Sequence, residues 1–283
     1  MSLIDLREPG DLLSPLVVVA FDGWVDAGSA ATGAAAQISE GGEVIGTFIA
    51  DRLFDYRARR PTLEIVDGKP MGLTWPELLL KRRRIRDRDL LIVAGPEPDY
   101  RWHAFADEMI ELALRLGVTE WISLGAIPAA VPHTRQVPVL GTSSRPGLLR
   151  GDVQAGPAGI LRVPAAAVSV LDLAATGVGI PAVGYYAQVP HYVSGPYPAA
   201  AIELIHAVSR HTEEEPSLGS LPKEAGAMRT RLDLATASDD ETRSYVARLE
   251  QMVDEARLPS GDELISDIER FLRDRDPGPG RPN

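Results

Sequence analysis

The sequence feature that most constrains the fold is an unbroken apolar run, Leu16–Phe21, near the start of the chain. Its residues show no polar alternation, which is typical of a strand buried on both faces of a sheet. A loop at 22–26 and a small-residue stretch at 27–38 follow it. We therefore expect a strand, a loop and a helix in that order.

The order of strand, loop and helix repeats along the chain. Further strands are predicted at 44–50, 90–94, 121–124, 137–141 and 182–189, and helices at 102–116, 165–176 and 198–211. Strands that alternate with helices favour a mainly parallel sheet with helices on both faces. A basic run at 81–88 is interpreted as the solvated end of a helix, where cations complement the helix dipole.

The C-terminal quarter has a different organisation. We expect an α/β domain at 1–212, a linker and short helix at 213–237, amphipathic helices at 238–275 and a disordered tail at 276–283. Capping-box patterns at Ser238 and Ser260 predict the starts of two helices. Their apolar stripes favour packing within the chain, and an interaction surface is the alternative.

The composition of the chain argues against several classes of function. The net charge of −11 repels phosphate backbones, so no nucleic-acid partner is expected. The absence of cysteine excludes disulfides and thiolate metal sites. No window supplies the ~20 apolar residues of a membrane span, and no secretory signal is evident, so we expect a cytoplasmic protein that does not bind membranes.

The common cofactor and catalytic motifs are missing or incomplete. The glycine spacing at 28–33 resembles a P-loop, but Ala34 and Ala35 stand where Lys and Ser/Thr are needed. No G-x-G-x-x-G follows a strand, and neither G-x-S-x-G nor H-E-x-x-H occurs. We therefore predict no cofactor and no metal, and we lean against an enzyme.

Polar side chains follow four of the predicted strands, at the edge where ligands of open α/β sheets bind. A loop rich in arginine, 54–61, adds groups suited to an anionic ligand or to an acidic partner surface. The candidate ligand-binding residues are Asp22, Trp24, Asp26, Arg57, Arg60, Glu97, Arg101, His103, His133, Arg135, His191 and Tyr192.

Each candidate also has a structural interpretation. Asp26 precedes a helix and is favoured as its cap, which leaves Asp22 the more open case. Loop arginines often pair with nearby aspartates, and a single histidine more often makes a structural hydrogen bond than it catalyses.

Seven segments carry a family resemblance: 20–34 (AFDGWVDAGSAATGA), 54–61, 73–76, 98–105, 123–135 (SLGAIPAAVPHTR), 156–160 and 190–201 (PHYVSGPYPAAA). Together they resemble the PAC2 (proteasome assembly chaperone 2) family, and 258–276 is similar to the C-terminal helix of its actinobacterial branch. The resemblance implies a three-layer α/β/α fold akin to phosphorylases and hydrolases. It also implies homo-oligomers, and eukaryotic and archaeal relatives are proteasome assembly chaperones.

Two functions follow from these observations. The first is a non-catalytic, chaperone-like interaction or assembly protein, which forms a homo-oligomer, in particular a trimer, and binds proteasome-related proteins. The alternative is a phosphorylase- or hydrolase-like enzyme, or a binder of a small anionic or nucleoside-like ligand.

Overall fold

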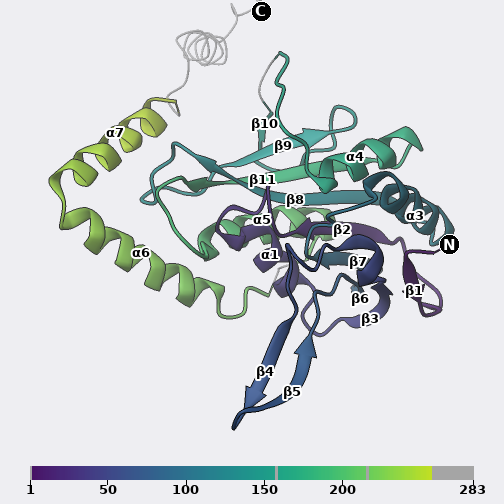
Figure 1. The fold of residues 1–283 in the computed structure, drawn as a ribbon. Helices are drawn as coiled ribbons and strands as arrows, with labels where there is room; N and C mark the ends of the chain where they lie inside the picture. The colour runs from purple at the N-terminus through teal and green to yellow at the C-terminus, as the bar shows by residue number, and fades with distance from the viewer. Residues whose placement is uncertain (1, 157–158, 215–216, 257–283) are drawn as a thin grey trace, which may run out of the picture. The chain divides into compact units, whose positions relative to one another are not determined.

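The computed structural model describes residues 2–156, 159–214 and 217–256 (Figure 1). The chain divides into two compact units, 1–234 and 235–283. Among the described residues, none of the helices combines the length and the apolar character needed to cross a membrane.

The first unit is built on a nine-stranded mixed sheet. Its four central strands, β7, β2, β8 and β11, run parallel, and the strands outside them add antiparallel pairs. In spatial order the strands are β1 (Ile4–Leu6), β3 (Glu43–Phe48), β6 (Leu79–Ile85), β7 (Arg88–Gly95), β2 (Leu16–Phe21), β8 (Glu120–Ala129), β11 (Ala182–Pro190), β9 (Val139–Ser143) and β10 (Gln154–Ala155).

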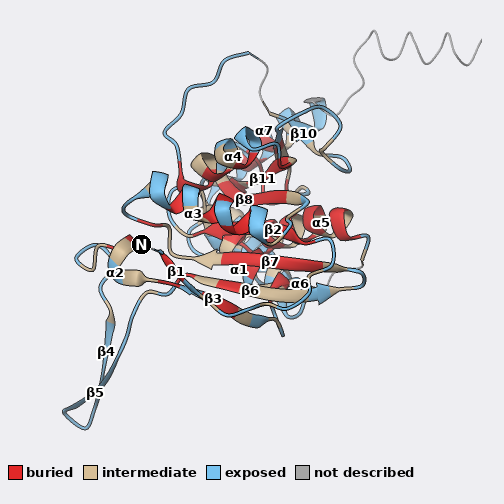
Figure 2. Ribbon diagram, turned by 90° about the vertical axis from the view of Figure 1, so that its right-hand side faces the viewer, coloured by how far each residue is buried: buried red, intermediate tan, exposed pale blue. Residues whose placement is uncertain are grey.

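Helices cover both faces of this sheet. On one face lie α1 (Ala30–Ile38), preceded by the short turn η1 (Ala27–Ser29), and α5 (Pro198–Thr212). On the other lie α3 (Trp102–Arg115) and α4 (Ala167–Gly177). Figure 2 shows the buried strands between them. The predicted three-layer α/β/α architecture with a mainly parallel, mixed sheet is confirmed.

The central strand β2 explains why the sheet needs two covers. Val17, Val19 and Phe21 belong to the core under α3 and α4, whereas Leu16 and its alternate neighbours belong to the core under α1 and α5. All six residues of β2 are buried. Each large apolar side chain buried in this way contributes about 1.5–3 kcal/mol.

The interpretation of 81–88 as a helix end is wrong. This run forms most of β6, and a tight turn leads from it into β7, with Ile85 paired to Arg88. Successive side chains of a strand point to opposite faces, so Arg82 and Arg84 lie on the same face, where both bind the buried Asp89. The strand accommodates Arg82 and Arg84 because Asp89 pairs with both of them.

A projecting hairpin is a further element that the sequence analysis did not predict. It consists of β4 (Thr62–Val66) and β5 (Lys69–Thr74), which form a separate two-stranded sheet and extend away from the nine-stranded one (Figure 1). The short helix α2 (Ala50–Leu53) lies upstream. Asp67 and Gly68 both have positive φ, as a two-residue type I′ turn requires, and the Asp-Gly pair is the sequence pattern that would have predicted it.

The long helix α6 (Leu221–Ala237) follows the α/β elements, and its apolar residues Leu221, Met228 and Leu232 pack on the core under α1 and α5. In the second unit, α7 (Asp240–Ala256) begins two residues after Ser238. Its first turn is capped by Asp239, whose Oδ2 accepts from the Thr242 N–H at 2.7 Å, so the capping box predicted at Ser238 is not formed. The helix predicted after Ser260 and the tail at 276–283 lie outside the described residues.

Candidate functional site at the carboxyl edge of the sheet

The carboxyl ends of the four central strands do not lie at one level. Val19 of β2 pairs with Ser123 of β8, so the end of β2 at Phe21 lies beside Gly125. Strand β8 continues to Ala129 rather than ending at 124, which places its end about 13 Å further along the strand direction. The loops after β2 and β7 therefore form one group of polar residues, and those after β8 and β11 form another.

The first group, the carboxylate cluster, consists of Asp22, Arg59, Glu97 and Asp99. Arg59 Nη1 lies 2.8 Å from Asp22 Oδ1, and Arg59 Nε lies 3.5 Å from Asp99 Oδ1. The Glu97 N–H donates to Asp22 Oδ1 at 3.1 Å. One arginine thus joins the ends of β2 and β7 to the loop at 54–61.

The carboxylates of this cluster also bind backbone groups. Glu97 Oε1 accepts from the Ala167 N–H at 2.7 Å and so fastens the start of α4, while burial raises the pKa of Glu97. Asp99 Oδ2 accepts from the Asp55 N–H at 2.8 Å. At Gly23, φ is +111° and an added Cβ would lie 3.1 Å from Glu97 Oε2, so this glycine permits the close approach. These contacts connect and position segments.

The arginine that enters the cluster is Arg59, and not Arg57 or Arg60, which are exposed. Arg59 and Asp99 are therefore site residues that sequence analysis omitted. Three arginines within four loop positions cannot be ranked by sequence, because the path of the backbone decides which of them turns inward.

Asp26 caps α1. Its Oδ1 accepts from the Ala31 N–H at 2.7 Å and from the Thr32 N–H at 3.3 Å, and its Oδ2 accepts from the Thr32 hydroxyl at 2.5 Å. Burial raises the pKa of Asp26. The structural interpretation of this residue therefore holds, although the α-helix starts at Ala30, after the turn η1. Trp24, in the same loop, is exposed.

The second group, the histidine cluster, consists of His133, Tyr192, Arg229 and Asp233. The buried His133 has its Nδ1 at 2.7 Å from the Tyr192 hydroxyl and its Nε2 at 3.2 Å from Asp233 Oδ1. Arg229 donates to Asp233 at 2.9 Å and to the His133 carbonyl at 3.1 Å. Helix α6 supplies the last two residues, which the sequence analysis did not name because it treated 213–237 as a linker and a short helix, with no site residues.

A cavity of about 280 Å³ adjoins the histidine cluster. It is lined by His133, Arg135, Gln136, Val137, Tyr197, Ala199, Glu203, Ala225, Gly226 and Arg229. His191 and the carbonyl of Ala129 lie within hydrogen-bonding distance, 3.2 Å, at the end of β11. Arg101 and His103 are exposed at the start of α3, which covers the other face of the sheet. The three histidine loops therefore do not converge on one cavity.

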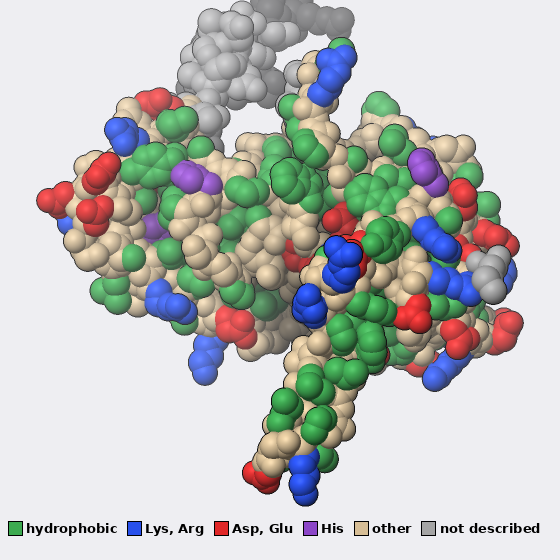
Figure 3. All heavy atoms as spheres, in the orientation of Figure 1, with side chains coloured by type: hydrophobic (Ala, Val, Ile, Leu, Met, Phe, Trp, Pro, Cys, Tyr) green, Lys and Arg blue, Asp and Glu red, His purple; other side chains and the backbone are tan. Residues whose placement is uncertain are grey.

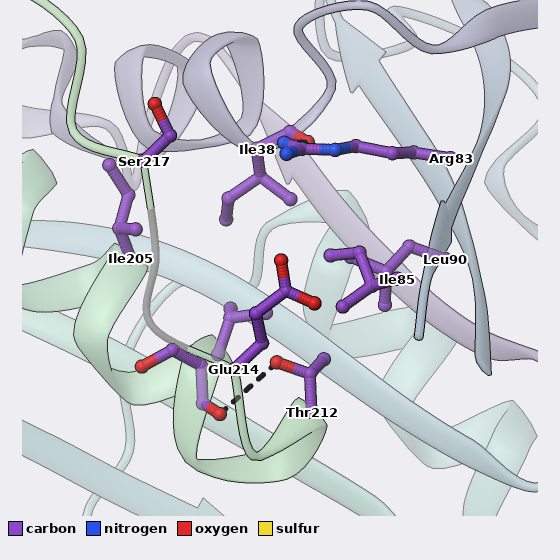
Figure 4. Close-up of a pocket in the computed structure, with 10 residues that line it drawn as sticks. Ile38, Arg83, Ile85, Leu90, Ile205, Thr212, Glu214 and Ser217 are labelled. Carbon is purple, nitrogen blue, oxygen red and sulfur yellow. Dashed lines mark hydrogen bonds between the residues drawn. The ribbon is translucent and has the colours of Figure 1, made fainter. Parts of the chain in front are cut away.

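A smaller cavity lies away from this edge, between α1, β6 and the end of α5 (Figure 4). Its volume of about 30 Å³ has room for about two water molecules. Arg83 crosses it and donates to the Ile38 carbonyl at 2.7 Å, and the Thr212 hydroxyl donates to the Ser209 carbonyl at 3.1 Å. It is too small for a metabolite. Among the described residues, no group of three His, Asp or Glu side chains is arranged to hold a metal ion.

The comparisons with known proteins decide the family. The model of the PAC2 family matches residues 20–235. The chain belongs to the PAC2 family. Among curated proteins, none matches this chain.

Solved structures agree with this assignment. A Corynebacterium glutamicum protein of unknown function is 30% identical, with a TM-score of 0.82 over 89% of this chain and 97% of its own. A Mycobacterium tuberculosis proteasome-assembly chaperone homologue is 36% identical, with a TM-score of 0.74 over 82% and 99%. Pyrococcus furiosus PbaB, an archaeal proteasome activator, is 16% identical, with a TM-score of 0.65 over 82% and 97%, and shares the fold.

Replacing Arg59 by glutamine is expected to lower the free energy of unfolding by about 1–3 kcal/mol, because Asp22 loses its charged donor and Asp99 loses its ion-pair partner. Arg57→Gln, in the same loop but exposed, is the matched control and should stay within about 0.5 kcal/mol of wild type. Urea unfolding measures both changes. Equal effects of the two substitutions would show that the carboxylate cluster does not depend on Arg59.

Proposed function

We propose that this PAC2 protein is a non-catalytic, chaperone-like interaction or assembly protein that forms homo-oligomers. The observation that carries the proposal is the β4–β5 hairpin, whose residues are all exposed although many of them are apolar. The contacts at the carboxyl edge agree with it, because Asp22, Asp26 and Glu97 are engaged with arginine, hydroxyl or backbone donors.

The hairpin has the composition of a surface that becomes buried. Six large apolar side chains on it or just beyond it are 45% to 64% exposed: Leu63, Ile65, Val66, Met71, Leu73 and Trp75. Figure 3 shows hydrophobic side chains along the projecting arm. A two-stranded hairpin alone is marginally stable in water, and contiguous apolar surface marks interaction sites. Contact with another chain would supply the missing cover.

The base of the hairpin is held by contacts with α2 and with the loops after β2 and β7. The rings of Tyr56 and Trp75 meet edge to face, with centroids 4.7 Å apart, and Tyr56 donates to Asp51 at 2.5 Å. Arg59 adds the ion pairs with Asp22 and Asp99 described above. An arm held in one direction loses less conformational freedom when it binds, which favours affinity.

A second copy of the chain is the partner that fits this arm. Residues 54–76 hold four basic and three acidic residues, a net charge of +1, whereas the whole chain carries −11. The arm is therefore attracted to the acidic body of a neighbour. An arm that docks on a different surface of the next copy makes a head-to-tail contact, and such contacts form a ring, such as the proposed trimer, when the rotation between copies closes.

If the hairpin forms the contact between copies, removing its apolar side chains should dissociate the oligomer. Changing Leu63, Ile65, Met71 and Leu73 together to serine or threonine is expected to reduce the protein to a monomer at micromolar concentration, as measured by light scattering after gel filtration. The control changes Leu114 and Val178, which are also exposed and apolar but lie elsewhere, and it should keep the oligomer. A wild-type monomer, or an unchanged mass of the hairpin variant, would refute the role of the arm.

Besides its own copies, the proposed partner of this protein is the proteasome of the same host. The 36% identity to a proteasome-assembly chaperone homologue supports this proposal. Purified protein should enrich 20S subunits from a host lysate above the level of a scrambled control. No enrichment would reject the proteasome as partner and leave the oligomer proposal to its own test.

A further inference from the structure

A third cavity, which we call the α4 cavity, lies far from the carboxyl edge. It has a volume of about 230 Å³ and is formed by the end of β9, the beginning of β11 and one side of α4. Five polar residues contribute to its lining beside Leu173 and residues 182–184, although most of its surface is apolar: Thr142 and Ser143 on β9, Ser144 just after it, and Asp172 and Thr176 on α4. Nothing in the proposed assembly role uses it.

Asp172 is the one charged residue of this lining. It lies on α4 between Leu171, which is buried, and Leu173, which is exposed. The Ser123 hydroxyl donates to its Oδ1 from β8, and Trp121 Nε1 donates in turn to Ser123 Oγ at 3.2 Å. Asp172 therefore reaches from the helix down to the sheet at the inner end of the cavity.

The surroundings of Asp172 differ from those of Asp89 and Glu120, and resemble those of Asp26, which also binds only neutral donors. Asp89 binds Arg82 and Arg84, and Glu120 binds Arg88. Asp172 has only neutral donors, and it forms no ion pair with any lysine, arginine or histidine of the described chain. A carboxylate removed from water without a cation is costly unless a further group compensates it.

Two glycines of the neighbouring strands make room for the ring of Tyr186. The ring of Tyr186 lies against Gly125 and Gly184, where an added Cβ would come within 2.5 Å and 2.8 Å of ring carbons. At Gly184 the same Cβ would also lie 2.6 Å from the Thr142 hydroxyl. A larger residue at 184 would therefore push hydroxyl groups out of place at the cavity wall.

We propose that the α4 cavity binds a small molecule with a protonated amine, whose ammonium group pairs with Asp172 and whose polar remainder contacts the hydroxyls of Thr142 and Ser144. The ammonium group supplies the positive charge that the protein itself does not place beside Asp172.

The hydroxyl groups have capacity left for such a ligand. Ser144 Oγ accepts from the Ala182 N–H at 3.1 Å, so its hydrogen remains to be donated. The Thr176 hydroxyl donates to the Asp172 carbonyl at 2.7 Å, so its lone pairs remain to accept from an ammonium N–H. The volume is slightly below that of a drug-sized pocket, roughly 300–1,000 Å³, and suits a diamine or an amino sugar.

Calorimetric titration of the full chain at pH 8 tests this with matched pairs of probes: ethanolamine against ethylene glycol, 1,4-diaminobutane against 1,4-butanediol, and glucosamine against glucose. At least one amine should bind at least tenfold more tightly than its neutral partner. If no amine binds, or if the neutral partners bind within tenfold, the proposal is wrong.

Variants assign the binding to the cavity. Asp172→Asn keeps the shape and should weaken amine binding at least tenfold, and Thr176→Phe, at an exposed position of the cavity rim, should weaken it by obstruction. Asp107→Asn, on the exposed side of neighbouring α3, is the control and should bind as wild type does. Amine binding that survives in Asp172→Asn with less than a tenfold loss would overturn the assignment, whatever the oligomeric state.

Discussion

Replacing Asp89 by alanine is expected to lower the free energy of unfolding by about 3 kcal/mol. Removing one member of a buried ion pair typically costs about 3–5 kcal/mol, and the lower end applies because Arg84, at 41% side-chain exposure, regains water. Asp89 itself has no exposed side-chain surface. It accepts from Arg82 Nε at 2.9 Å, Arg84 Nε at 2.8 Å and the Leu13 N–H at 2.7 Å.

Urea unfolding at pH 7 measures this loss, and Asp87→Ala provides the control. Asp87 lies two residues earlier, in the turn before β7, and is exposed, so its replacement should change stability by no more than about 0.5 kcal/mol. A loss below about 1 kcal/mol for Asp89→Ala would mean that the arginines of β6 are stable without this partner.

The wild type should also show the titration of Asp89. Burial opposes ionisation, but the hydrogen bonds from Arg84 and Arg82 outweigh it and lower the pKa of Asp89 to about 2. The folded state therefore binds this proton less readily than the unfolded state. The contribution of Asp89 to stability is present above about pH 4 and is lost as the pH falls toward 2.

Replacing Asp172 by asparagine is expected to have the opposite pH dependence. Burial raises the pKa of Asp172 from 3.8 to about 7, against the hydrogen bonds from Ser123 and Trp121. The folded state binds the proton more readily than the unfolded state, so wild-type stability should fall as the pH rises from about 4 to 7. This difference in pKa corresponds to a loss of about 4 kcal/mol in the free energy of unfolding. Asparagine does not ionise, so the variant avoids this loss.

Unfolding free energies of wild type and Asp172→Asn, measured from pH 4 to pH 8, test this expectation. The variant should gain up to about 4 kcal/mol relative to wild type across that range. The control Asp107→Asn, at an exposed position, should show no such gain. Parallel curves for wild type and Asp172→Asn would show that the carboxyl group is ionised or solvated without penalty.

Several elements were readable from the sequence because local patterns determine them. The apolar run of β2, the helical stripe of α3 and the helix of α5 each appear where the hydrophobic spacing places them. The motifs that resemble PAC2 proteins identified the family and, with it, the three-layer fold. Helix capping by Asp26 also follows from position alone, since a carboxylate beside a helix start meets its free N–H groups.

Other elements depend on partners that are distant in sequence. The basic run of β6 forms a strand because it pairs with β7 and because Asp89 binds its arginines. Residues 81–88 alone contain no pattern that predicts this strand. The pairing of β8 with β11 determines the length of β8. Because β8 is long, the polar loops at the carboxyl edge form two separate clusters. Arg59, Asp99, Arg229 and Asp233 became site residues only through the path of the backbone between them.

The sequence by itself determined the layers of this protein, because the burial of apolar side chains repeats with the period of each helix and strand. The tertiary structure decided which charged groups meet. An ion pair joins residues by distance in space, and spacing along the chain does not encode that distance. For this reason, the arginine run and the candidate site could be interpreted only once the fold was known.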